Sequence, residues 1–276
     1  MKKRYIYLYL IGWWLFCVAC TGNFRDYNTD LSGITNEDLI IDDNGYGIRL
    51  GIIQQGIYFN YDYGKGKNWP FQLIQNLNAD MFSGYMHDAK PLNGGSNNSD
   101  YNMQDGWNSA MWTHVYSYIF PQIYQSENAT RDTHPALFGI TKILKVEVMH
   151  RVTDYYGPII YRHFANAEKH YQPDTQKEVY YEFFNELDSA VVALIGYIEE
   201  KPESNGFARF DILLDGKYSS WVKFANSLRL RLAMRLASIA PDKARSEIEK
   251  IKENDYGFFE RGSEKVAVST KSGYIN

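Results

Sequence analysis

Cysteine is almost absent from this chain of 276 residues. Its only two cysteines, Cys17 and Cys20, both lie at the end of an N-terminal hydrophobic stretch. From Thr21 onward the chain therefore has no disulfide, no cysteine-ligated zinc or iron–sulfur site and no thiol nucleophile.

Motifs for metal binding and catalysis are also lacking. The six histidines never fall into a metal-ligand spacing such as H-E-x-x-H, and we expect each of them on the surface or in a loop. The sequence has no phosphate-binding loop, no nucleophile-elbow serine and no kinase signature. Carboxylates are numerous, but nothing in their spacing selects a catalytic pair. We therefore expect no metal and no cofactor.

An excess of positive charge is missing as well. The chain has 29 basic and 33 acidic residues, which gives a formal net charge of −4. Residues 1–19 contain Lys2, Lys3 and Arg4 and no acid, so their removal would leave 26 basic residues against 33 acidic ones. A chain this acidic, without basic blocks, is a poor candidate for binding nucleic acid or anionic lipid surfaces.

The N-terminus has the features of an export signal. A basic start is followed by an apolar run over residues 5–16, which is too short for a transmembrane helix of about 20 residues. Ala19-Cys20 then resembles a bacterial lipoprotein cleavage box, in which lipid is attached to the cysteine. We expect a signal peptide over residues 1–19 and a lipidated Cys20 as the mature N-terminus; the alternative is an ordinary secretory signal cut near Ala19.

The body of the chain has the periodicity of helices. Apolar residues recur at helical spacing over 72–82, 111–124, 136–152, 176–200, 221–240 and 242–252. In the segment 37–58 the glycines at 45 and 47 predict a break, with regular spacing only after them. Alternating strand patterns are nearly absent, so we predict a mostly α fold, an α-solenoid of helix pairs joined by long irregular loops.

Aromatic residues are abundant, at 16% of the chain. Several lie around a loop over residues 87–106 that also contains many asparagines, a mixture suited to stacking on sugar rings and bonding their hydroxyls. The candidate ligand-binding residues there are Asp80, Tyr85, Asn93, Tyr101, Asn102 and Trp107. The alternative is that the rings fill the core and the asparagines make turns.

Three segments together resemble the SusD/RagB family of outer-membrane lipoproteins from Bacteroidota. They are residues 24–39 behind the cysteine, the run TDYYGPIIY at 153–161, and WVKFANSLRLRLAMR at 221–235. In the second, Ile160 stands where family members usually have proline. The resemblance covers residues 20–260, and it identifies residues 20–276 as a SusD-like domain.

The resemblance implies a fold of tetratricopeptide-like helix pairs and a function without catalysis. Family members are lipid-anchored in the outer membrane at the cell surface. They capture glycans, or in some members peptides, and act as a lid on a SusC-type TonB-dependent transporter. Aromatics and amides on loops would hold the ligand. The same family is typically almost twice as long, so we expect this chain to be the N-terminal part of the usual domain.

Two other functions stay open at this point. A peptide- or protein-binding member of the family would have a cleft fitted to an extended chain. A secreted glycoside hydrolase would need two carboxylates about 5–10 Å apart across a cleft.

Overall fold

The computed structural model describes residues 44–59, 69–90, 92–166, 172–202 and 204–260, together with four residues between 262 and 267. The predicted signal peptide, Cys20 and the first family-like segment lie outside these residues. Within the described part, no helix is long and apolar enough to cross a membrane.

The fold is mostly α, as predicted. Four long helices, α10 to α13, follow the ranges expected from the periodicity to within a few residues. The α-helices of the described part are α4 (Asn44–Gly56), α5 (Trp69–Phe71), α6 (Asp80–Phe82), α7 (Asp105–Asn108), α8 (Ala110–His114), α9 (Phe120–Thr130), α10 (Pro135–Tyr156), α11 (Gln176–Glu200), α12 (Tyr218–Leu236) and α13 (Pro241–Lys250). The π-helical segments η2 (Gln72–Ala79) and η5 (Val115–Ile119) join α5 to α6 and α8 to α9, and short 3-10 turns lie at η3 (Leu92–Gly95), η4 (Asn98–Asp100) and η6 (Ile251–Glu253).

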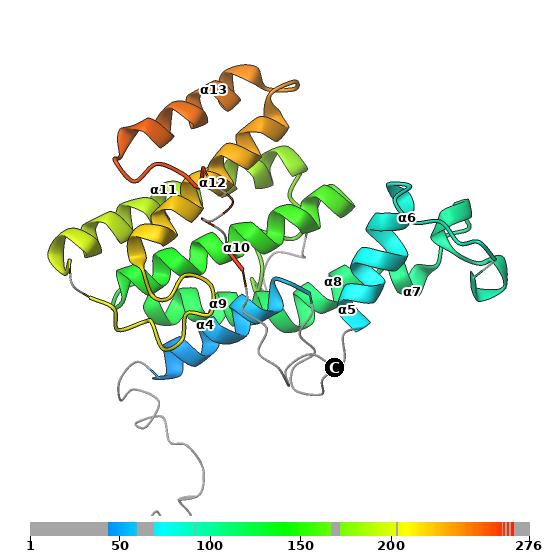
Figure 1. The fold of residues 1–276 in the computed structure, drawn as a ribbon, viewed down its shortest axis with the longest axis horizontal. Coiled ribbons are helices and arrows are strands. Elements are labelled where there is room, and N and C mark those ends of the chain that lie inside the picture. The colour runs from blue at the N-terminus through cyan, green and yellow to red at the C-terminus, as the bar shows by residue number, and fades with distance from the viewer. Residues whose placement is uncertain are drawn as a thin grey trace, which may run out of the picture. The chain divides into compact units, whose positions relative to one another are not determined.

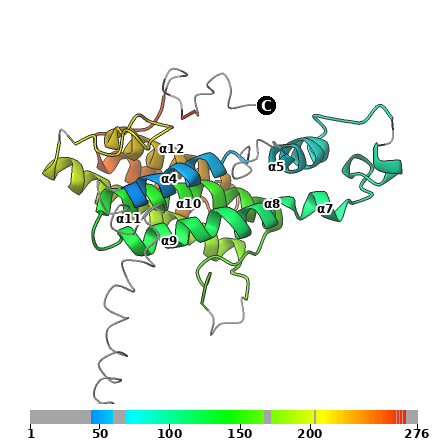
Figure 2. The same ribbon diagram turned by 90° about the horizontal axis from the view of Figure 1, so that it is seen from below.

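Each long helix packs mainly on its neighbours in sequence. Helix α10 contacts α9 and α11, α11 contacts α12, and α12 contacts α13 (Figure 1). Viewed from below, α9, α10 and α11 lie together with α4 along them (Figure 2). This succession of neighbour contacts is the packing of a helical solenoid, and it confirms the predicted architecture.

Local signals explain where the two central helices begin and end. Pro135 takes the first position of α10, where its missing N–H costs nothing, and Gly157 ends the helix with a positive φ of 76°. Helix α11 starts with a capping box, in which the Thr175 hydroxyl accepts from the Glu178 N–H and the Glu178 carboxylate accepts from the Thr175 N–H.

The predicted break at Gly45 and Gly47 is wrong, because α4 runs through both. At Gly47 an added Cβ would lie 2.0 Å from the ring of Phe210, so the glycine lets the loop before α12 pack directly on the helix. The Gln54 side chain secures the same contact by donating to the Phe210 carbonyl (3.1 Å) and accepting from the Ile212 N–H (3.0 Å). The glycine is there for close approach and not to end the helix.

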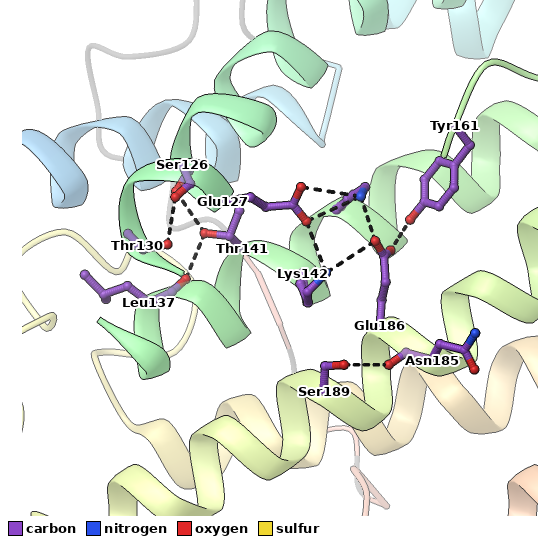
Figure 3. Close-up of polar contacts among 11 residues, drawn as sticks. Ser126, Glu127, Thr130, Leu137, Thr141, Lys142, Tyr161, Asn185, Glu186 and Ser189 are labelled. Atoms are coloured by element: carbon purple, nitrogen blue, oxygen red, sulfur yellow. Dashed lines mark hydrogen bonds and ion pairs between the residues drawn. The ribbon is translucent and has the colours of Figure 1, made fainter. Parts of the chain in front are cut away.

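The core contains a cluster of charges between α9, α10 and α11. The Lys145 ammonium lies 2.6 Å from Glu186 and 3.3 Å from Glu127, and Lys142 contacts the same two carboxylates (Figure 3). The Tyr161 hydroxyl donates to Glu186. Burial lowers the pKa of Lys145, but the two carboxylates outweigh it and the net shift of the pKa is upward, so Lys145 stays charged.

The prediction of surface histidines is wrong at two positions. His114 and His150 are each 1% exposed. Burial lowers the pKa of His114 to about 4, and burial together with the nearby Arg231 lowers that of His150 to about 3. Both rings therefore behave as neutral, hydrogen-bonding parts of the core and not as surface groups.

Candidate functional site

The predicted site residues all lie in one local region, from α6 through the loop 83–104 to α7. This loop, which we call the ring–amide loop, follows the teal part of the chain beyond α6 in Figure 1. Asp80 begins α6, and Trp107 lies in α7. The candidate residues thus share one region because they are neighbours in sequence.

Buried amides hold the ring–amide loop to the helices on either side. Asn98, only 1% exposed, donates to the Leu77 carbonyl (2.8 Å) and to the Asn108 side chain (2.9 Å), and its own oxygen accepts from the Gln104 N–H. Asn78, also buried, donates to Asn108 (3.0 Å) and to the carbonyl of Trp107 (3.3 Å). Because the loop interior is hydrogen-bonded at both ends, its surface side chains are presented in a fixed arrangement.

A second group of contacts closes the loop on itself. The Asp88 carboxylate, with a side chain 4% exposed, accepts from the Ser99 hydroxyl, the Leu92 N–H and the amide of Asn97. These hydrogen bonds, with that of Ser99 first, lower the pKa of Asp88 below its ordinary value and so favour the ionised carboxylate.

Asn93, Asn102 and Asp80 make contacts within this region. The Asn93 amide donates to the Ser96 carbonyl (3.0 Å) from a backbone with a φ of 49°, and the Asn102 amide donates to the Gly95 carbonyl (2.7 Å). The Asp80 carboxylate accepts from Gln75 at 2.6 Å on one oxygen and from Asn76 at 3.1 Å on the other. All three side chains are therefore held by hydrogen bonds within the protein.

The rings of the loop are the side chains turned to solvent. Tyr85 is 88% exposed and Tyr101 is 71% exposed. Tyr101 leans on Phe82, with ring centroids 6.0 Å apart and planes at 43°. Trp107 is half-buried. An exposed ring supported from behind by another ring is a suitable platform for the apolar face of a sugar.

The run TDYYGPIIY positions this region on the solenoid. Tyr156, at the end of α10, donates its hydroxyl to the carbonyl of Asn108 (2.6 Å) and accepts from the N–H of Trp112 (3.1 Å). Its ring also packs edge-on against Trp112. The side chain of Asn108 thus accepts hydrogen bonds from Asn78 and Asn98, and its backbone carbonyl accepts one from Tyr156 of α10. These bonds link the ring–amide loop to the core.

Sequence reasoning missed part of this arrangement. Asn108 and Asp88 organise the loop, yet neither stands out from the other polar residues in the sequence. Two methionines, Met86 and Met103, are each 52% exposed beside the candidate rings. Apolar residues in a loop can equally fill its interior, so only the folded backbone shows which way they face.

The charges in the core do not form a glycosidase-type pair. The Glu127 and Glu186 side chains are 9% and 5% exposed, and both are neutralised by Lys142 and Lys145. They lie in the packing between helices and not across a cleft. Within the described residues, no group of three or more His, Cys, Asp or Glu side chains could hold a metal ion.

The chain belongs to the SusD-like family, the SusD and RagB outer membrane lipoproteins, whose family model matches residues 26–276. No curated protein matches it. Among solved structures, a SusD homologue from Bacteroides vulgatus is 44% identical with a TM-score of 0.77, over 84% of this chain and 47% of that one.

A chitin-binding SusD homologue from Flavobacterium johnsoniae is 35% identical with a TM-score of 0.74, over 81% of this chain and 46% of that one. A SusD homologue from Bacteroides uniformis is 29% identical with a TM-score of 0.66, over 79% of this chain and 44% of that one. The chain therefore spans about half the length of the solved structures that it matches.

Proposed function

We propose that this chain captures glycans at the cell surface as part of a non-catalytic outer-membrane lipoprotein. It is anchored through lipid on Cys20 and passes its ligand to a SusC-type TonB-dependent transporter. The membership of the SusD-like family supports this role, as does the similarity to a chitin-binding homologue. The anchor is supported by the family and by the Ala19-Cys20 sequence, and the transporter partner by the family.

The observation that carries the proposal is the exposed ring of Tyr101 on a loop with a fixed interior. Tyr101, Tyr85 and Trp107 would stack on sugar rings, while Asp80, Asn93 and Asn102 would bond hydroxyl or amide groups of the ligand. Because buried amides order the loop before the ligand arrives, little conformational entropy is lost on binding.

Affinity electrophoresis of the full chain tests the proposal. Gels would contain glycol chitin, xylan, pectin or starch, and wild type would run beside Trp107→Ala and Tyr101→Ala. We expect retardation by one polysaccharide, reduced in both variants, with no reducing sugar released. Tyr118→Ala is the control, because Tyr118 is an exposed ring (44%) on η5, outside the ring–amide loop.

Other outcomes point to the two alternative functions. Release of reducing sugar would contradict the absence of catalysis. No retardation by any polysaccharide, with a native thermal unfolding transition, would contradict glycan capture and favour the peptide-binding alternative.

A further inference from the structure

A groove of about 390 Å³ opens between three helix ends, apart from the ring–amide loop. It lies where α10 and α12 end and α11 begins. Its lining includes three charged residues, Asp154, Lys177 and Arg235, and three apolar ones, Leu236, Ile239 and Ala240. A volume of this size is in the range of small-ligand sites, which are roughly 300–1,000 Å³.

The charged lining residues carry a net positive charge, from Lys177 and Arg235 against Asp154. Both oxygens of Asp154 are engaged, one by Arg235 at 2.8 Å and the other by the Tyr180 hydroxyl at 2.5 Å. Arg235 also donates from Nε to Tyr180 at 3.0 Å, yet its side chain remains 49% exposed. Asp154 therefore fixes the guanidinium in place, and the outer Nη hydrogens are oriented for an anion.

Lys177 supplies the second cationic group of the lining. Its ammonium lies 5.6 Å from the centre of the Tyr181 ring, which also lines the groove, and the residue is exposed. Since Asp154 is paired with Arg235, the charge of Lys177 is not balanced within the lining. This is a local positive site in a chain whose formal net charge is −4.

The apolar lining residues suit a branched apolar side chain. Leu236 is buried, at 6% exposure, and Ile239 has 78% of its surface exposed. A uronic acid would place hydroxyl groups against these side chains, which offer no hydrogen bonds. A leucine or valine would instead bury apolar surface there, at about 25 cal/mol per Å².

We propose that this groove binds the C-terminal carboxylate of a peptide that ends in a branched apolar residue. Lys177 and Arg235 hold the carboxylate, and Leu236 and Ile239 receive the terminal side chain. The site is independent of the proposed glycan capture, because no residue of the ring–amide loop lines it.

Fluorescence anisotropy on the full chain tests this proposal with a fluorescein-labelled peptide, Gly-Gly-Ala-Leu, that has a free C-terminus. We expect saturable binding that weakens at least about tenfold when the C-terminus is amidated, the size of a charge-assisted hydrogen bond. Replacement of the last leucine by glycine should weaken binding to a similar extent, since it removes the buried apolar group.

Matched variants locate the site. Lys177→Gln and Ile239→Ser change exposed residues and should each weaken binding, Lys177→Gln by up to about fivefold as expected for an exposed ionic contact. Lys201→Gln is the control for the first, because Lys201 lies over the Tyr197 ring at a similar 5.4 Å, and Val192→Ser is the control for the second, at 73% exposure. The controls should bind as wild type does.

Four results would overturn the proposal. One is the absence of saturable binding, and another is equal affinity for the free and the amidated peptide. The third is unchanged affinity in both Lys177→Gln and Ile239→Ser. Competition by glucuronate as strong as that by the unlabelled peptide would also count against it, because glucuronate supplies the carboxylate without the apolar group.

Discussion

The ring of Tyr101 rests against the ring of Phe82, with centroids 6.0 Å apart and planes inclined at 43°. Phe82 is the last residue of α6 and is half-buried, whereas Tyr101 is 71% exposed on the loop. The supporting ring restricts how Tyr101 can turn, so its outer face is available to a ligand without a large loss of side-chain entropy.

Tyr101→Ala should therefore weaken glycan binding by about tenfold, which corresponds to the upper part of the range for one aromatic contact. Tyr101→Phe keeps the ring and loses only the hydroxyl, so it should retain most of the affinity. Isothermal titration with the oligosaccharide that the electrophoresis identifies would measure both. A Tyr101→Ala protein that binds as well as wild type would remove this ring from the site.

The buried amide of Asn98 should matter as much for binding as the exposed rings do. Asn98→Ala removes three hydrogen bonds, two that join the loop to Leu77 and Asn108 and one to Gln104 at the end of the loop. We expect the loop amides to exchange with solvent faster and glycan affinity to fall, while the solenoid helices keep their protection. Hydrogen exchange followed by mass spectrometry would resolve the two regions.

Asn93→Ala is the matched control for that experiment. Asn93 is exposed and makes one hydrogen bond inside the loop, to Ser96. It should change exchange only next to the turn. Equal effects of the two substitutions on exchange across the whole loop would contradict the special role of Asn98.

The long helices could be predicted from the sequence because their apolar stripes and end signals are local. Pro135, Gly157 and the Thr175–Glu178 box all lie within a few residues of the helix ends that they define. Gly47 shows the limit of such reasoning. Its role depends on Phe210, which is far away in sequence. The local sequence therefore predicts a helix break at a glycine that instead allows close packing of another segment.

The candidate site was predictable as a region, but its internal organisation was not. A loop rich in rings and amides indicates binding, and the structure does turn Tyr85 and Tyr101 outward. Which asparagines are buried depends on where the helices beside the loop end. Asn98 and Asn93 have the same side chain, yet one holds the loop to the core and the other lies on its surface.

The anchor prediction can be tested with two neighbouring cysteines. Cys20→Ser should prevent lipid attachment and move the protein from the membrane fraction to the soluble one, because the lipid on Cys20 is the predicted anchor. Metabolic labelling with palmitate and detergent phase partitioning would measure this. Cys17→Ser is the control and should stay labelled; loss of label in Cys17→Ser alone would place the lipid elsewhere.

His150 should make folding stability depend on pH. Burial, and then the positive charge of Arg231, lowers its pKa to about 3 in the folded chain, whereas an unfolded histidine titrates near 6.5. A lowered folded pKa means that the unfolded state takes up the proton first. The stabilisation is therefore complete above about pH 6.5 and is lost as the pH falls towards 3.

Between pH 7 and pH 5 this linkage should cost about 2 kcal/mol in the free energy of unfolding. The fall in the free energy of unfolding from pH 7 to pH 5 should be smaller by that amount in His150→Gln than in wild type. Urea unfolding at the two pH values would measure it, with His87→Gln as the control on a side chain that is 71% exposed. An identical pH dependence in wild type and His150→Gln would show that this imidazole is not buried neutral.

Lys145 should be among the most sensitive positions for stability. It contacts both Glu127 and Glu186 in the core and lies 4.7 Å from the centre of the Tyr161 ring, so Lys145→Met leaves two buried carboxylates with only Lys142 between them. Loss of one partner from a buried ion pair costs about 3–5 kcal/mol, because the remaining charge is left without compensation.

Lys252→Met is the control: it breaks an exposed pair with Glu249 and should cost no more than about 1 kcal/mol. Urea midpoints measured side by side would decide: if the two variants lose the same stability, the cluster is not closed to water, and its charges contribute no more than a surface pair.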